Sequence, residues 1–378
     1  MTSSYKPAII RRAVAAMFFI AGLCFSSWAS RIATIQQKLG LSEAALGAVL
    51  FALPVGLMLS LPLAGWAVNK VGSRKVLAIS LSMYGLALAG LGFVDNVYML
   101  AANLLLFGVA SNSVNISVNT QAVATELLYS KPIMASFHGV WSLAGFIGAG
   151  IGTVMIGQGV DPMPHFILIT IITIIAVLIC WRYLIKDKGA EKKKSTFAKP
   201  DAALITLGLI AFCSMVIEGA MFDWSTIYFK KVVMATGAWE GAGYTAGMCT
   251  MAGGRFIADS FAARFGLKTT LQISGALSLS GLLLVVLLPT LLPCIIGFML
   301  IGAGISSVVP LVYSAAGRST TMQPGPAIAA VSTISFVGFL VGPPVIGFLA
   351  EASSLKMSFL FLALMALLVI VFTTRAKV

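Results

Sequence analysis

Charged side chains are scarce in this 378-residue chain, because Asp, Glu, Lys and Arg together make up only 10% of the residues. Hydrophobic residues make up 59%, and the mean hydropathy is +1.00. A soluble fold of this length has too little interior to bury so much apolar surface. We therefore expect lipid to be the solvent around most of the chain.

Motifs of enzymes and metal proteins are also missing. The sequence has no GxxxxGK[ST] phosphate loop, no HExxH pair and no Gly-x-Ser-x-Gly elbow. Its cysteines stand singly in apolar surroundings, with no CxxC pair at metal-ligand spacing. We expect no cofactor, no metal site and no enzymatic activity. An intramembrane enzyme built on Glu218, Asp223 and His138 is one alternative, and a membrane receptor or scaffold that transports nothing is another.

Long apolar runs follow one another along the whole chain. They are continuously apolar over about 18 to 25 residues, enough to cross a hydrocarbon core of about 30 Å as helices, whereas barrel strands alternate apolar and polar residues. The sequence therefore predicts an all-α integral membrane protein. The twelve predicted spans are 12–31, 44–68, 75–94, 97–125, 132–157, 165–185, 203–229, 238–260, 268–288, 290–316, 325–350 and 354–374.

The basic residues fall mainly on one side of the predicted spans. Most of the 25 Lys and Arg lie on the face that carries the N-terminus, which predicts that both termini are cytoplasmic. This bias also explains the net charge of +13 without a nucleic-acid partner. The basic residues on the opposite face are Arg31, Lys38, Lys230, Lys231 and Lys356.

Two halves of the chain resemble one another. Gly65–Lys75 recurs in Gly254–Lys268, and Ser142–Phe146 recurs in Ser335–Phe339, each at a spacing of about 190 residues. Such duplication of membrane-embedded halves is typical of transporters. The pattern predicts two six-helix bundles.

The halves cover residues 1–186 and 201–378 and are joined by the one long polar stretch, 187–200. We expect this stretch to be a solvated cytoplasmic linker that leaves the two halves free to move.

The Gly65–Lys75 loop resembles the signature between the second and third helices of the major facilitator superfamily, although Asn69 stands where Asp is usual. The resemblance covers nearly the whole chain and implies the major facilitator fold, with its two bundles and alternating access. Shorter segments resemble the fucose-permease-like branch of uncharacterised inner membrane transporters. These segments are Ser27-Trp28-Ala29-Ser30-Arg31, His138-Gly139, Glu218-Gly219, Asp223-Trp224 and Gly342-Pro343-Pro344.

The repeated charged loops are candidate latches between conformations. Lys70 and Arg74 lie in the first loop, and Arg255, Asp259 and Arg264 lie around the second. An acid that pairs with a base in one conformation and releases it in the other biases a two-state equilibrium. Topological anchoring by positive charge alone is the alternative.

Polar residues inside the spans are candidates for binding a solute. Asn112, Asn115 and Asn119 form one stripe along the fourth span, and amides facing lipid would be costly. They are therefore expected to face a hydrated cavity, or else to bond neighbouring helices. The resemblance favours the cavity, because helices 1, 4, 7 and 10 line the central path of that family. Trp28 and Trp224 are further solute-binding candidates, or else anchors at the membrane interface.

Glu218 lies deep in the seventh span, about 22 Å from its start. A carboxylate there costs about 2.5 to 3.5 kcal/mol and marks a proton pathway more often than packing. We predict that Glu218 couples protons to transport, with a structural pair to an Arg and direct contact with the solute as alternatives. His138 is a second candidate for proton coupling because its ring titrates near neutral pH, although a simple hydrogen-bonding role is also open.

Opposite charges near the ends of the spans suggest two gates. Arg31 is predicted to pair with Asp223 in an outer gate, and Glu126 with Arg318 in an inner gate. His165 is expected in an outer loop with little functional meaning.

Together these features predict a proton-coupled secondary active transporter for a small polar or amphipathic solute, sugar-like or another metabolite. A monomer suffices for this mechanism. The alternative is a proton-driven efflux pump for drugs or metabolites, which a cavity lined mostly by Phe and Met would favour.

Overall fold

The computed structural model describes residues 5–129, 133–186, 200–322 and 324–376. Every regular element in these residues is a helix, which confirms the predicted all-α membrane fold. The α-helices are α1 (Pro7–Ala29), α2 (Ile32–Leu39), α3 (Glu43–Leu50), α4 (Ala52–Val71), α5 (Ser73–Gly92), α6 (Val97–Glu126), α7 (Met134–Gly157), α8 (Pro162–Cys180), α9 (Ala202–Lys231), α10 (Ala242–Phe265), α11 (Leu267–Leu287), α12 (Leu291–Ile305), α13 (Val308–Ala316), α14 (Pro324–Ala352) and α15 (Leu355–Arg375). Short 3₁₀ turns lie at η1 (Trp181–Tyr183) and η2 (Gly237–Gly241).

Eleven helical stretches in the described residues are long and apolar enough to cross a membrane. The remaining predicted span, 238–260, corresponds to α10, which has 24 residues but is less apolar than the others. Each predicted span therefore matches a helix or a pair of consecutive helices.

Two predicted spans, 44–68 and 290–316, are each broken into two helices, and prolines explain both breaks. A proline has no N–H to donate and its ring clashes with the carbonyl four residues earlier. Pro54 therefore disrupts the turn at Leu50, where α3 ends, and Pro310 disrupts the turn at Ser306, just after α12. The predicted span 12–31 ends where Ser30 and Arg31 separate α1 from α2, so α2 extends beyond that prediction.

The chain divides into two compact units. The first contains residues 1–40 and 49–192, and the second contains residues 41–48 and 193–378. The predicted linker, 187–200, lies outside the described residues except for Pro200. Residues 41–48 were expected in the first half of the chain, but their contacts assign them to the second unit.

Segment 41–48 packs on α14 within the second unit. A Cβ atom built on Gly47 would lie 3.0 Å from the Cα of Gly347, so the two backbones are in close contact. Near the start of the segment, Glu43 Oε1 lies 2.6 Å from Lys231 Nζ of α9. Backbone packing and an ion pair therefore join this segment to α9 and α14.

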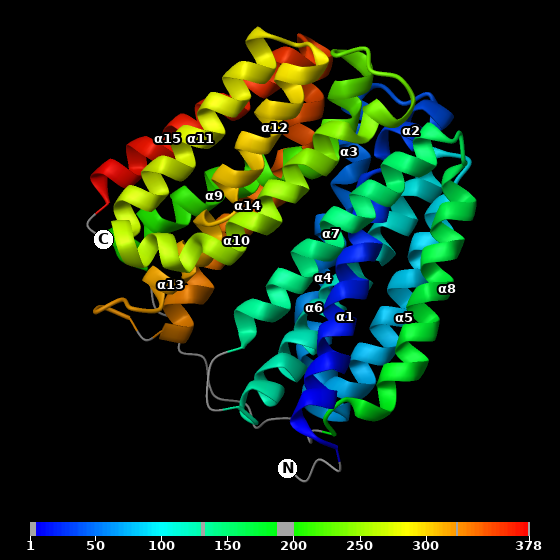
Figure 1. Ribbon diagram of the computed structural model, residues 1–378, viewed down its shortest axis with the longest axis vertical. Helices are drawn as coiled ribbons and strands as arrows, with labels where there is room; N and C mark the ends of the chain where they lie inside the picture. Colours follow the sequence, from blue (N-terminus) through cyan, green and yellow to red (C-terminus); the bar gives the residue numbers. More distant parts are fainter. Residues whose placement is uncertain (1–4, 130–132, 187–199, 323, 377–378) are drawn as a thin grey trace. The chain divides into compact units, whose positions relative to one another are not determined.

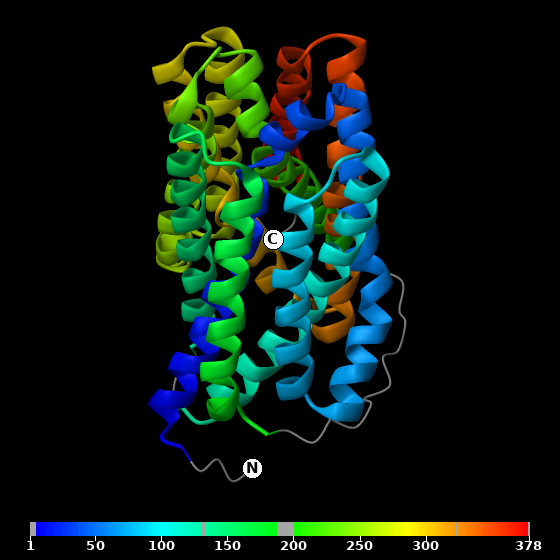
Figure 2. The same cartoon turned by 90° about the vertical axis from the view of Figure 1, so that its right-hand side faces the viewer.

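The same pattern of helix pairs occurs in both units. In the first unit α1 packs on α7, α4 on α6 and α5 on α8, and in the second α9 packs on α14, α10 on α12 and α11 on α15. Figures 1 and 2 show the helices of each unit running lengthwise beside one another. The internal repeat in the sequence is thus a repeat of packing.

Equivalent glycines permit two of these equivalent helix pairs to approach closely. A side chain on Gly108 of α6 would strike the carbonyl of Leu53 on α4, and one on Gly302 of α12 would strike the carbonyl of Gly247 on α10. Small residues at such seams let two helices meet backbone to backbone.

Candidate functional site

The strongest chemical feature of the second unit is an ion pair between α9 and α10. Arg255 Nη2 lies 3.2 Å from Glu218 Oε1, and the two side chains are only 20% and 11% exposed. Glu218 is 16 residues beyond the start of α9, or about 24 Å along the helix. Both groups therefore lie deep within membrane-spanning helices.

Packing on one face of α9 holds this pair in place. Glu218, Met221 and Phe229 follow one another on that face. Side chains on Gly247 and Gly243 of α10 would meet Met221 and Phe229 respectively, so the face lies directly against α10. The missing side chains on α10 thus make room for α9.

The ion pair is a candidate for proton-controlled behaviour. Arg cannot lose its proton in a protein, so Glu218 is the member that can change charge. A proton on the carboxylate removes the attraction and leaves the guanidinium without its counter-charge. Gain or loss of one proton therefore changes how strongly α9 and α10 attract each other.

Arg255 lies inside α10, ten residues before its end and within the predicted span 238–260. Its contact with Glu218 matches the structural Arg pair that the sequence analysis left open as an alternative for Glu218. The latch with Asp259 stays a prediction, because the side chain of Asp259 lies outside the described part of the structure.

The C-terminal third of α9 holds four consecutive polar or amphipathic residues that are buried, from Asp223 to Thr226. In the described residues, no hydrogen bond or ion pair reaches the Asp223 carboxylate, the Trp224 indole nitrogen, or the hydroxyls of Ser225 and Thr226. Trp28 in the first unit likewise has a buried indole nitrogen without a partner and lies beside Phe107, 6.4 Å between ring centroids. Buried polar atoms without partners are uncommon and often mark sites occupied by water or a ligand.

The predicted amide stripe of α6 is divided in the structure. Asn112 is buried and donates to Ser60 Oγ of α4 at 2.8 Å, so it joins two helices as the alternative interpretation expected. Asn119 Nδ2 donates to Asn115 Oδ1 at 2.7 Å on a more open face of α6. Asn115 and Asn119 thus remain the candidates for contact with a solute.

A buried Arg–His contact in the first unit was missed by the sequence analysis. His165 belongs to α8 rather than to a loop, and its side chain is fully buried. Arg31 is 1% exposed, donates through Nε to His165 Nδ1 at 3.4 Å, and also bonds the Val160 carbonyl. This contact fixes Nδ1 as the acceptor, so neutral His165 carries its proton on Nε2. The predicted pairing of Arg31 with Asp223 stays a prediction.

The other predicted gate and proton-coupling residues have local partners. Glu126 Oε2 accepts from the backbone N–H groups of Ile133 and Met134 at 2.7 and 2.8 Å, which satisfies the first turn of α7. His138 is exposed and packs edge-on against Phe18, with ring centroids 5.5 Å apart. The inner gate and the proton role of His138 stay predictions.

Three of the four predicted latch cations lie over aromatic rings, and the fourth, Arg255, pairs with Glu218. Lys70 lies over Trp66 at 4.7 Å, Arg74 over Trp181 at 4.4 Å and Arg264 over Phe265 at 5.3 Å. Cation–π contacts of this kind are weakly stabilising at exposed sites.

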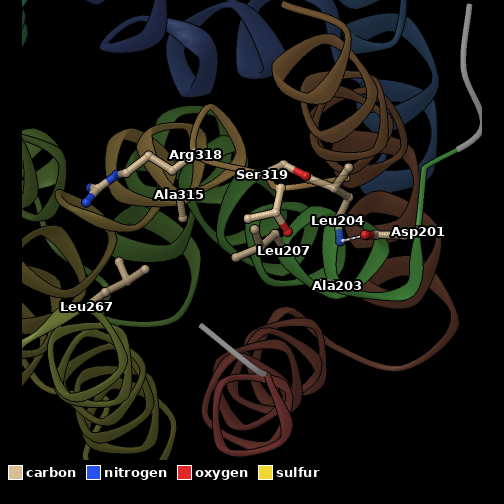
Figure 3. Close-up of a pocket in the computed structure, with 9 residues that line it drawn as sticks. Asp201, Ala203, Leu204, Leu207, Leu267, Ala315, Arg318 and Ser319 are labelled. Carbon is tan, nitrogen blue, oxygen red and sulfur yellow. Dashed lines mark hydrogen bonds between the residues drawn. The ribbon is translucent and has the colours of Figure 1, made fainter. Parts of the chain in front are cut away.

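A pocket of about 330 Å³ lies where α9 and α11 begin and α13 ends. Figure 3 shows Arg318 and Asp201 on opposite sides of the pocket, whose lining also includes Leu204, Leu207 and Leu267. Asp201 accepts from the Leu204 N–H and the Thr321 hydroxyl, and these bonds hold the pKa of its carboxyl below its usual range. The cap at Asp201 therefore explains why α9 begins here.

Comparison with known proteins places the chain among transporters. Residues 14–322 and 243–377 match the family model described as Major Facilitator Superfamily. An uncharacterized MFS-type transporter of Yersinia pestis is 32% identical over 352 residues, which are 93% of this chain and 92% of that protein. An uncharacterized transporter of Sinorhizobium fredii is also 32% identical, over 97% of this chain and 98% of that protein.

Solved structures share the fold at much lower identity. The crystal structure of the nucleoside transporter NupG has a TM-score of 0.77 at 15% identity and covers 98% of this chain and 99% of that one. An inward-facing bacterial homolog of the human lysosomal transporter Spinster has a TM-score of 0.72 at 13% identity, covering 99% and 98% of the two chains.

Proposed function

The chain belongs to the major facilitator superfamily, and we propose that it is a secondary active transporter that couples a small polar or amphipathic solute to protons. That it is a multi-pass membrane transporter follows from its family and its apolar helices. Proton coupling, a sugar-like or other metabolite as the solute, and alternating access of the two units belong to the proposal. So does membership of the fucose-permease-like branch, which rests on the short motifs of the sequence.

The single observation that carries proton coupling is the buried pair of Glu218 and Arg255. A carboxylate in a membrane-spanning helix is costly, by about 2.5 to 3.5 kcal/mol on insertion scales, so its presence calls for a function. Protonation of Glu218 breaks the pair and changes the packing preference of α9 and α10. A proton can therefore shift a two-state equilibrium by the difference in its affinity for the two states.

Polar side chains in each of the two units support a hydroxyl- or amide-bearing solute. Asn115 and Asn119 offer both donors and acceptors on the open face of α6. Trp28 and Trp224 each have a buried indole N–H with no partner in the described residues, which fits a site where a solute or water supplies the acceptor.

For location, the proposal is the cell inner membrane, with both termini in the cytoplasm and a monomer as the working unit. Single cysteines placed near the two ends of the chain test the orientation in a cysteine-free background. Labelling of intact cells by a reagent that cannot cross the membrane should fail at both positions. Labelling at either position would contradict the proposed orientation.

Proton coupling is tested by reconstituting the purified protein into vesicles that contain a pH-sensitive dye. A library of unlabelled polar solutes is added outside, with nucleosides included because the NupG structure shares the fold. We expect at least one solute to move protons with the wild type and not with E218Q. Proton movement that survives E218Q would remove Glu218 from the mechanism, and transport of a solute with no proton movement would reject coupling.

A further inference from the structure

Asp223 is a second carboxyl inside a membrane-spanning helix, and its surroundings differ from those of Glu218. It is 8% exposed and lies eight residues before the end of α9, about 12 Å along the helix. Five residues separate it from Glu218, which places the two carboxyls on different faces of the helix. Each therefore meets its own set of neighbours.

The face of α9 that carries Asp223 lies against α14. Phe212, Val216 and Asp223 follow one another on this face at spacings of four and seven residues. Gly338 of α14 approaches Phe212, and Gly342 approaches Val216, so the two helices run parallel. Asp223 lies two turns beyond Val216, so it faces the part of α14 that lies two turns beyond Gly342. The residues of α14 that point toward α9 there are uncharged.

No charged group on the described elements packed around α9 forms an ion pair or hydrogen bond with Asp223. In the described part of the second unit, α12 and α13 have no charged residue, and α15 has only Lys356 and Arg375, near its two ends. On α10, the side chain of Arg264 lies over Phe265, and that of Asp259 is not described. The remaining pairs are Arg255 with Glu218, Lys230 with Glu240, Lys231 with Glu43 and the Ala44 N–H with Glu351.

The residues next to Asp223 offer polar atoms without partners. Thr226 follows it by three residues and so lies on a neighbouring part of the helix surface. Most threonine hydroxyls in these helices bond the carbonyl four residues earlier, as Thr206 and Thr373 do, but the buried Thr226 hydroxyl bonds nothing in the described residues. A hydroxyl in this state is available to water or to an adjacent carboxylic acid.

From these observations we infer that Asp223 is a proton-binding site of the second unit, distinct from the pair of Glu218 and Arg255. The structure gives Glu218 a guanidinium that stabilises its charged form, whereas it gives Asp223 no cation within its unit. Burial without a counter-charge favours the neutral, protonated acid. The ligand of this site is therefore the proton itself, held by the Asp223 carboxyl.

The inference adds a carrier to the proposed function, and it rests on that function only for the step in which the bound proton is transported. The two carboxyls would then act differently. Asp223 keeps its proton in the conformation described here and releases it when its surroundings become hydrated. Glu218 has Arg255 as a counter-charge, and protonation of Glu218 breaks that pair.

The test is infrared difference spectroscopy of the purified protein in lipid at neutral pH, where a protonated carboxylic acid gives a C=O band that carboxylates lack. We expect this band in the wild type, its loss in D223N and its retention in the matched variant E218Q. Absence of the band from the wild type, or its survival in D223N, would overturn the inference. So would its loss in E218Q alone.

A third variant separates the inference from the predicted outer gate. If Asp223 were held as a carboxylate by Arg31, R31Q would create the band, whereas our account predicts no change.

A carbodiimide, which modifies protonated carboxyls, provides a measurement on the wild type that needs no variant to fold. Mass spectrometry should locate the modification on Asp223 and not on Glu218, and the reverse would refute the inference. Failure of solute-driven proton movement with an unchanged band would reject the coupling but not the proton site.

Discussion

Removing one member of the Glu218–Arg255 pair should destabilise the protein unequally, depending on which member is removed. E218Q leaves a guanidinium deep in the helices, and Arg cannot shed its proton there. R255Q leaves a carboxyl, which can take up a proton and become neutral. Breaking a buried pair costs about 3 to 5 kcal/mol when the remaining charge is fully buried.

The exposure of these side chains sets the expected magnitude. Because they are 11% and 20% exposed, some hydration of the remaining charge is possible, and the lower end of that range applies. We expect a loss of about 3 kcal/mol for E218Q and about 1 to 2 kcal/mol for R255Q. The double variant E218Q/R255Q has no buried charge and should lose less than the sum of the two single variants.

The free energy of unfolding is measured for the four proteins in mixed micelles, under conditions where unfolding is reversible. The double-mutant cycle isolates the interaction energy of the pair. Equal losses for the two single variants would contradict the reasoning about their unequal ability to neutralise. Additive losses would show that the two groups do not stabilise each other.

Three further predictions concern stability. D201A removes the N-terminal cap of α9 and should lower the free energy of unfolding by about 1 kcal/mol at pH 7. Because hydrogen bonds lower the pKa of Asp201 in the folded protein, the difference in stability between wild type and D201A should be lost as the pH falls below about 4. A difference in melting temperature that stays constant with pH would contradict this prediction. G302A should cost about 1 to 3 kcal/mol because its Cβ strikes α10, whereas the control G253A, whose Cβ meets nothing, should be neutral or stabilising in the same thermal assay. H165F removes the acceptor of the Arg31 Nε–H bond and should cost about 1 to 3 kcal/mol of stability, seen as a lower melting temperature. H165N keeps an acceptor and should lower the melting temperature less. Equal losses for the two variants would argue against the contact.

Much of the fold could be predicted from the sequence because the membrane allows few backbone solutions. Continuous apolar runs specify helices, and their lengths specify spans, so each predicted span has a counterpart in the structure. Breaks at Leu50 and Ser306 could also have been predicted, since Pro54 and Pro310 each follow by four residues.

The side-chain partners were harder to predict, because they depend on which helices meet. Glu218 was identified by its depth, but Arg255, although inside the predicted span 238–260, was interpreted as part of a latch and not as the specific partner of Glu218. His165 was assigned to a loop because its helix begins at Pro162, whose fixed φ suits the first turn. Proline at this position was the signal that could have placed His165 in the helix.

The assignment of residues 41–48 depends on tertiary contacts alone. Nothing in the local sequence distinguishes Gly47 from other small residues in apolar spans. Its contact with Gly347 and the ion pair of Glu43 with Lys231 join residues far apart in the chain. Patterns within a single span carry no information on such pairings.

The central claim, transport of a solute coupled to protons, is tested most directly by recording currents from the reconstituted protein on a solid-supported membrane. Addition of a transported neutral solute, without any ion gradient, should produce a transient current whose size depends on pH. E218Q should bind the same solute without producing that current. A pH-independent response in the wild type, or an undiminished current in E218Q, would contradict the account.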